Sequence, residues 1–92
     1  MQYFDWNPEK NEWLKRERDI SFEEVVTAYE EGQVVAIIVH HNPKRYPGQK
    51  LFIVIIRAYV YLVPFVEDDE KIFLKTIIPS RKATKEYIGK NK

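Results

Sequence analysis

The sequence predicts an α+β fold in which N-terminal helices and a short C-terminal helix pack on a mainly antiparallel sheet of four to five strands. Helical signals fill the first third of the 92 residues, and β-branched apolar runs typical of strands follow from Val34 onward. The connections between these later strands are too short for parallel crossovers. We expect the helices to cover one face of the sheet and residues 1–92 to form a single domain.

Two helices are expected in the first third of the chain. Asn7 can cap the first helix, and Pro8 suits its first helical position because proline lacks only an N–H that would be unpaired there. The second helix has the clearest start in the sequence, since Ser21 and Glu24 have the spacing of a capping box. Gly32 fits the C-terminal stop of this second helix.

Strands are expected at residues 3–5, 34–39, 51–57, 59–66 and 72–78. Pro64 lies inside one of these runs, which favours a bulge or an edge position because proline cannot donate to the ladder. Residues 67–70 are all acidic and indicate a hairpin turn. Pro79 ends the last strand, and Ser80 can cap a terminal helix over residues 80–88.

Positive charge is concentrated in two segments of a chain whose formal net charge is only +1. Residues 80–92 hold five cations against one anion, a local net charge of +4, and residues 40–50 hold three cations and no anion. Phosphate contacts need such local clustering, although exposed lysines are also common on ordinary surfaces. The phosphate-binding hypothesis assigns contacts to Lys44, Arg45, Arg81, Lys82 and Lys85.

Lys75 interrupts the apolar run 72–78, so its charge must reach water, an acid or a phosphate. The functional interpretation is a phosphate contact on an exposed sheet face, where Arg57 could meet it. The alternative is that Lys75 protects a sheet edge from pairing with another chain.

His40 and His41 are the only histidines, and neighbouring strand residues point to opposite faces. A metal site is therefore not expected, nor is any other cofactor. Either histidine could transfer a proton near neutral pH, or both could be solvated loop residues. Tyr87 is the next candidate for proton transfer, and the alternative is an ordinary half-buried tyrosine.

Composition and hydropathy exclude several classes of protein. The chain has no cysteine, which excludes disulfides, thiolate chemistry and cysteine zinc sites. The N-terminus lacks the basic and apolar regions of a signal peptide, and the longest apolar run, residues 51–56, is far shorter than a membrane span. We expect a soluble cytoplasmic protein with no membrane partner.

Three segments form an ordered set of motifs: FDWNPEKN at residues 4–11, ISFEEV at 20–25 and IPSRKAT at 78–84. They resemble, in the same order, the opening F-x-W-D-x-x-K-N, the helix start S-F-E-E-A and the closing I-S-A-R-x-A-T of BrnT-type toxins. Each match alone is weak, since a capping box explains part of the second. Together they span almost the whole chain.

This resemblance implies a RelE-like fold with helices on a curved antiparallel sheet. It also implies the toxin of a type II toxin–antitoxin pair, an endoribonuclease that needs no metal because the RNA 2′-OH is the nucleophile. The implied partners are RNA and a ribbon-helix-helix antitoxin, which could assemble with the toxin into a higher-order complex. Arg81 matches the family arginine and would stabilise the phosphate in the transition state, with Lys75 and Arg57 beside it.

The chain departs from the family between the first two helices, where K-H-G is usual and Glu17, Arg18 and Asp19 stand here. Arg18 aligns with the family histidine, but a guanidinium cannot act as a general base at neutral pH, so Arg18 is expected to bind RNA. Pro79 also replaces the usual serine of the closing motif. The alternative function is a non-catalytic RNA-binding or protein-interaction module of the same fold.

Overall fold

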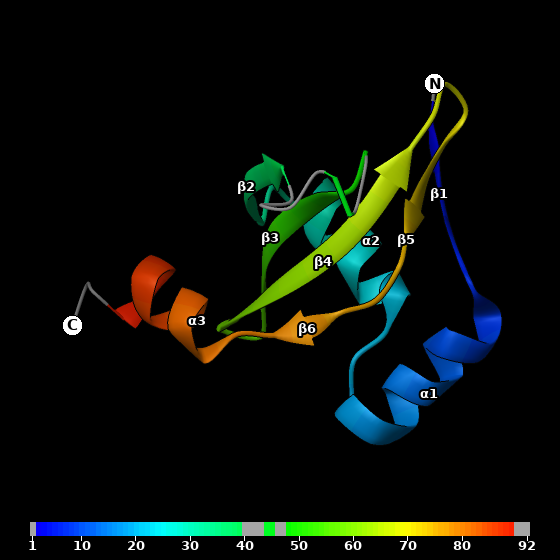
Figure 1. Ribbon diagram of the computed structural model, residues 1–92. Helices are drawn as coiled ribbons and strands as arrows, with labels where there is room; N and C mark the ends of the chain where they lie inside the picture. Colours follow the sequence, from blue (N-terminus) through cyan, green and yellow to red (C-terminus); the bar gives the residue numbers. More distant parts are fainter. Residues whose placement is uncertain (1, 40–43, 46–47, 90–92) are drawn as a thin grey trace.

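The structure, a computed structural model, describes residues 2–39, 44–45 and 48–89. Its elements are β1 (Tyr3–Trp6), α1 (Pro8–Arg18), α2 (Phe22–Glu30), β2 (Val34–Val39), β3 (Lys50–Ile56), β4 (Tyr59–Glu67), β5 (Lys71–Leu74), β6 (Ile78–Pro79) and α3 (Arg81–Tyr87) (Figure 1). The predicted α+β class is confirmed. The described part of the chain contains six strands in one sheet, rather than four to five.

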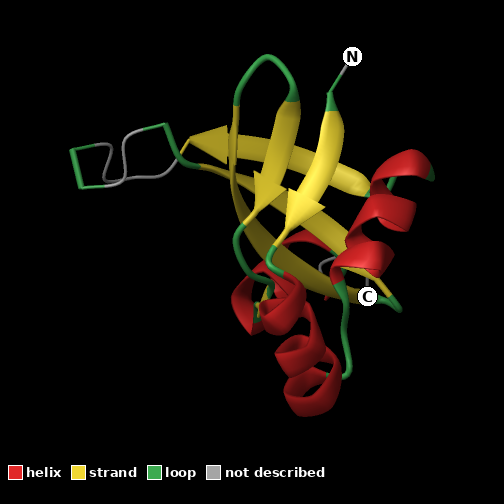
Figure 2. Ribbon diagram, turned by 90° about the vertical axis from the view of Figure 1, so that its right-hand side faces the viewer, coloured by secondary structure: helices red, strands yellow, loops and turns green. Residues whose placement is uncertain are grey.

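The sheet has the order β1-β5-β4-β3-β2, so β1 and β2 form its two edges. β1 runs parallel to β5, and the other pairs are antiparallel, which makes the sheet mixed but mainly antiparallel. Figure 2 shows that the strands at the two ends of the sheet cross at a steep angle, as the right-handed twist of successive strands produces.

The prediction of one continuous strand over residues 72–78 is wrong. β5 and β6 pair with the same side of β4 at different places, and residues 75–77 interrupt the pairing between them. Pro64 of β4 lies opposite this interruption, where its carbonyl accepts a hydrogen bond of 2.8 Å from the N–H of Lys75. Because the N and C=O of a strand residue point to the same side, the missing N–H of Pro64 faces the gap. This proline therefore lies in an interior strand, not at an edge.

Alternating side chains of the sheet form two apolar clusters on opposite faces. Phe52, Val54 and Ile56 of β3 pack with Leu14, Phe22 and Val25 of the first two helices. On the other face, Ile53 and Val60 pack with Ala83 of α3. The expectation that all helices cover one face is thus wrong for α3. The cause is the alternation of β3 and β4, which carry apolar residues on both faces.

The first two helices begin where the sequence predicts. The Asn7 side chain accepts from the N–H groups of Glu9 and Lys10, and Ser21 and Glu24 form both hydrogen bonds of a capping box. Gly32 has a φ of 77° just beyond the end of α2, a conformation that glycine adopts without strain.

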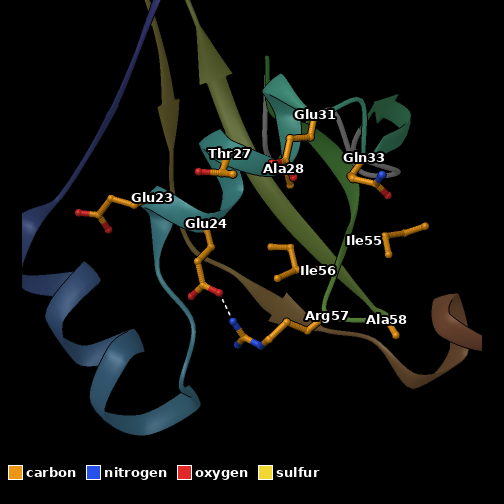
Figure 3. A pocket seen from close by; sticks show the side chains of 10 residues that line it. All are labelled: Glu23, Glu24, Thr27, Ala28, Glu31, Gln33, Ile55, Ile56, Arg57 and Ala58. Atoms are coloured by element: carbon orange, nitrogen blue, oxygen red, sulfur yellow. Dashed lines mark hydrogen bonds and ion pairs between the residues drawn. The ribbon is translucent and has the colours of Figure 1, made fainter.

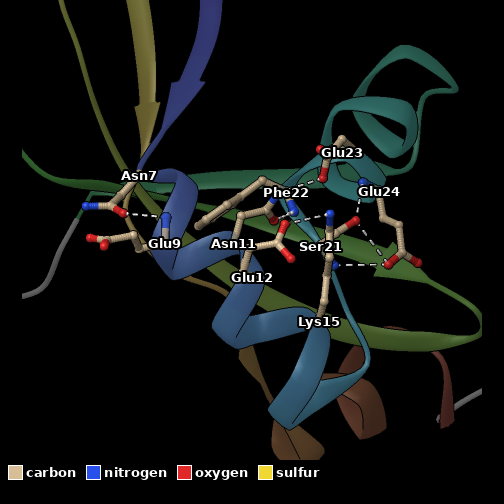
Figure 4. A network of polar contacts seen from close by, with 9 residues as sticks. All are labelled: Asn7, Glu9, Asn11, Glu12, Lys15, Ser21, Phe22, Glu23 and Glu24. Atoms are coloured by element: carbon tan, nitrogen blue, oxygen red, sulfur yellow. Dashed lines mark hydrogen bonds and ion pairs between the residues drawn. The ribbon is translucent and has the colours of Figure 1, made fainter.

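Asn11 links α1 to the start of α2 and is only 3% exposed. Its Oδ1 accepts from the N–H of Phe22 at 2.8 Å, and its Nδ2 donates to Oε1 of Glu23 at 2.8 Å (Figure 4). The N–H of Phe22 belongs to the first turn of α2, where no helical carbonyl is available. The hydrogen bond from Asn11 is the main cause of the lowered pKa of Glu23.

Asn11→Ala is expected to lower the free energy of unfolding at pH 7 by about 2–3 kcal/mol, because it leaves the buried N–H of Phe22 without a partner. The same change at the exposed cap, Asn7→Ala, should cost about 1 kcal/mol. The lowered pKa of Glu23 stabilises the fold above the ordinary value of 4.5, and this part is lost as the pH falls through the folded-state pKa. Urea unfolding of both variants at pH 7 and about pH 3 measures these differences, and equal losses for both variants at pH 7 would contradict the role of Asn11.

The β3–β4 hairpin has a two-residue turn, Arg57-Ala58, between the paired residues Ile56 and Tyr59. Both turn residues have positive φ, 50° and 62°. Two such residues are the signature of a type I′ turn, which suits the twist of a hairpin but favours Asn and Gly. An alanine in this conformation is strained.

Ala58→Gly is therefore expected to raise the free energy of unfolding by about 0.5–1 kcal/mol, the strain relieved less the entropy that glycine loses on folding. The opposite change at a comparable backbone position, Gly32→Ala at φ 77°, should destabilise the fold by a similar amount, because alanine is strained at a positive φ. The added Cβ would meet nothing within 4 Å, so no steric clash adds to this cost. Thermal unfolding of the two variants tests the pair. A shift of the same sign in both would disprove the explanation.

The acidic segment 67–70 forms the β4–β5 hairpin turn that the sequence predicts. Asp68 accepts hydrogen bonds from the N–H groups of Lys71 at 2.9 Å and Glu70 at 2.8 Å. These hydrogen bonds, led by that of Lys71, lower the pKa of Asp68. The acidic charges thus serve the turn itself.

Candidate nucleic-acid interface

α3 is fixed to the beginning of β4 by its first residues. The N–H of Ser80 donates to the carbonyl of Val60 at 3.0 Å, and the Ser80 hydroxyl accepts from the N–H of Ala83 at 3.0 Å, as predicted for a cap. Thr84 joins the two elements, since its Oγ1 donates to the Ser80 carbonyl and accepts from the N–H of Val60 at 2.9 Å. Thr84 lies in the segment IPSRKAT, but nothing in the sequence alone marks it as a residue that positions α3.

The exposed side of α3 carries the cations Arg81, Lys82 and Lys85, which we call the α3 basic surface. None of the hydrogen bonds and ion pairs within residues 2–39, 44–45 and 48–89 involves these three side chains. Tyr87 ends the same helix and is 42% exposed. The buried contact of Ala83 holds the helix, so its cations are presented to solvent from a fixed support.

Arg18 has a structural role in this fold. Its Nη1 donates to the carbonyl of Ile77 at 2.8 Å, and its guanidinium lies 5.0 Å from the centre of the Trp13 ring. The hydrogen bond satisfies a carbonyl in the irregular segment between β5 and β6. Arg18 thus links the end of α1 to the chain just before α3.

Arg57 is also engaged within the protein. It forms an ion pair with Glu24 and donates a second hydrogen bond to the backbone carbonyl of Asp19. Figure 3 shows its side chain directed toward α2 and away from α3. The expected meeting of Arg57 with Lys75 is not among the contacts of the described residues, because Arg57 braces the β3–β4 turn against the α1–α2 connection.

Arg57 lines an open pocket of about 480 Å³ between α2 and β3. Its other charged lining residues are Glu23, Glu24 and Glu31, so carboxylates outnumber the single guanidinium (Figure 3). Like charges repel, and this pocket is therefore unsuited to a phosphate group. The exposed cations of α3 lie on the opposite face of the sheet.

Lys75 is exposed and lies along the same side of β4 as α3. The N–H of Lys75 donates to the carbonyl of Pro64, and the N–H of Ser80 donates to the carbonyl of Val60. Pro64 and Val60 are four residues apart in β4, so the backbones of Lys75 and Ser80 lie roughly 13 Å apart along the strand. One phosphate cannot bridge that separation. The long side chains of Lys75 and Arg81 could instead contact neighbouring phosphates of one strand.

The remaining predicted site residues lie elsewhere or outside the described chain. Lys44 and Arg45 form an exposed turn between β2 and β3. His40 and His41 lie outside the described residues. Among the residues that are described, no group of three or more acidic, His or Cys side chains is placed to hold a metal ion.

Comparison of the chain with protein-family models, with curated proteins and with solved structures finds no match. No helix in the described part of the chain is long and apolar enough to cross a lipid bilayer. The arrangement of Arg81, Lys82, Lys85 and Tyr87 on α3, with Lys75 along the same strand, is therefore the basis for assigning a function.

Proposed function

We propose that this protein is the toxin of a type II toxin–antitoxin pair, a cytoplasmic endoribonuclease with a RelE-like fold that cleaves RNA without a metal ion. One observation carries the proposal. Arg81, which matches the arginine of the BrnT-type closing motif, is exposed at the start of α3 and makes no hydrogen bond or ion pair within the described residues. An exposed arginine whose donors are unpaired within the described residues can bind a phosphate without breaking an existing bond.

In the proposed reaction the RNA 2′-oxygen attacks the adjacent phosphorus, the bond to the 5′-oxygen breaks, and a 2′,3′-cyclic phosphate forms. The 2′-OH proton passes to a base, and an acid protonates the departing 5′-oxygen. Arg81 stabilises the negative charge that builds up on the phosphate oxygens, and Lys75 holds the neighbouring phosphate. His40 or His41 transfers the protons, with Tyr87 as the alternative.

A second candidate is a non-catalytic module that binds RNA, or an acidic protein surface, through the same α3 basic surface. The observation that favours it is Arg18, which occupies the family histidine position and is committed to Ile77 and Trp13. In either case a ribbon-helix-helix antitoxin is the proposed partner, covering α3 and joining the toxin in a higher-order complex.

Incubation of the purified protein with end-labelled RNA in EDTA tests the proposal. Cleavage to fragments with 2′,3′-cyclic phosphate ends is the expected result. Binding without cleavage would replace the toxin proposal by the RNA-binding module, and the three cations of α3 should then give a salt dependence of log K with a slope of about −2. No affinity for RNA at low salt would overturn both and leave the protein-interaction role.

A further inference from the structure

β2 forms an edge of the sheet that lacks charged residues and proline. It pairs with β3 on one side, and no other strand within residues 2–39, 44–45 and 48–89 pairs with its outer side. Such an edge presents a row of N–H and C=O groups, and a strand that supplies the complementary row is the occupant that satisfies them.

The side chains of β2 are apolar on both faces of this edge. A register shift between Val34 and Ala36 sets the alternation, after which Ile37 lies beside Phe52 and Ile38 beside Leu51 on the opposite face. The exposed fractions are large for such residues, 44% for Val35, 56% for Ile37, 44% for Ile38 and 69% for Val39. A partner strand would cover apolar side chains on both faces at once.

The other edge of the sheet, β1, is shorter than β2 and carries a charged residue. β1 has four residues and includes Asp5, which pairs with Lys71 at 3.6 Å. β2 has six residues and contains no charged residue and no proline, two of the devices that keep an edge strand from pairing. Its register shift lies at the start of the strand, and residues 36–39 keep a regular register with β3. The chemistry therefore singles out β2 and not β1.

We propose that β2 pairs with β2 of a second copy of this chain, antiparallel about a two-fold axis. Charge favours this occupant, because two copies of VVAIIV bring no like charges together and the formal net charge of the chain is only +1. The two-fold axis makes the interface the same patch on both copies, so the pairing closes at a dimer. One continuous sheet then runs through both molecules.

The pairing would also place two α3 basic surfaces on one assembly. Ala36 of β2 packs in the same apolar cluster as Ile88, just after α3, and Figure 1 shows both elements on one side of the molecule. A dimer through β2 therefore flanks the shared edge with an α3 from each copy. The proposed dimer itself does not depend on RNA cleavage.

Sedimentation equilibrium of the full chain, from about 1 µM to about 500 µM, tests the proposal. We expect a monomer–dimer equilibrium, with the dissociation constant raised at least about tenfold by Ile37→Lys or by Ile38→Lys. Both side chains are exposed in the monomer, so neither change should prevent folding, which circular dichroism verifies. Tyr3→Lys, at an exposed residue of β1, is the matched control and should leave the dissociation constant unchanged.

Three outcomes would overturn the proposal. A monomer at all concentrations would mean that another occupant, or none, covers β2. Growth beyond the dimer would indicate open-ended pairing of unlike edges. Weakening by Tyr3→Lys to the same degree would move the interface to β1. Should the lysine variants fail to fold, hydrogen exchange of the unmodified protein decides, since only a β2 interface gives concentration-dependent protection of β2 amides without the same protection in β1.

Discussion

Phe52→Ala is expected to lower the free energy of unfolding by about 3–5 kcal/mol, the cost of removing a fully packed aromatic side chain. Phe52 lies in the interior strand β3, between β4 and β2, and is 2% exposed. Its ring stacks on Phe65 of β4 at a centroid distance of 3.9 Å, and Tyr29 of α2 meets its edge at 5.8 Å. Alanine would leave a cavity where β3, β4 and α2 meet.

The size of this loss matters because the chain is small. A domain of 92 residues has a total stability on the order of 5–14 kcal/mol, so the substitution removes a large share of it. Urea unfolding measures the loss, and Phe73→Ala is the matched control. Phe73 of β5 is only half-buried, so the same deletion there should cost about 1–2 kcal/mol. Equal losses at the two positions would show that the Phe52 cluster is not the centre of the core.

The parts of the fold that the sequence predicts correctly depend on neighbouring residues. Asn7 caps α1, Ser21 and Glu24 form the capping box of α2, and Ser80 caps α3, because each cap bonds N–H groups within three residues of itself. Residues 67–70 turn the chain for the same reason. Such local rules hold whatever the rest of the chain does.

The features that the sequence does not predict depend on partners far along the chain. The break between β5 and β6 follows from where Pro64 meets Lys75, and the parallel pairing of β1 with β5 joins residues almost seventy positions apart. α3 packs on the face of the sheet that carries Ile53 and Val60. The apolar character of these two residues alone would fit either face. Register and face are properties of the assembled sheet.

The same distinction explains the candidate site. The sequence offers Arg18, Arg57 and Arg81 as possible phosphate ligands, and places Arg81 first through its basic segment and the family resemblance. The structure separates them, because Arg18 bonds a carbonyl 59 residues away and Arg57 pairs with Glu24 across 33 residues. Arg81 has no such partner within the described residues. A cation that stabilises the fold is a poor choice for a ligand contact, since binding would have to break its existing bonds.

In the proposed reaction, Arg81→Ala is expected to reduce the rate of RNA cleavage by about 10²–10³-fold, the usual cost of removing one donor to a developing negative charge. Growth arrest on expression should be lost with it. The side chain is exposed and unpaired within the described chain, so the free energy of unfolding should change by less than about 0.5 kcal/mol. Arg81→Lys keeps the charge but not the forked pair of donors, and we expect an intermediate rate.

Two control variants separate the position of Arg81 from total charge and from stability. Arg16→Ala removes an exposed arginine from α1 whose ion pair, within the described residues, is with its neighbour Glu17 at 3.6 Å, and it should leave both cleavage and stability unchanged. Arg18→Ala should lower stability through the lost bond to Ile77, which separates a structural arginine from one that binds phosphate. Full toxicity in a folded Arg81→Ala protein would remove Arg81 from the reaction. An equal loss of cleavage in Arg16→Ala would show that total charge, and not the position of Arg81 on α3, governs the activity.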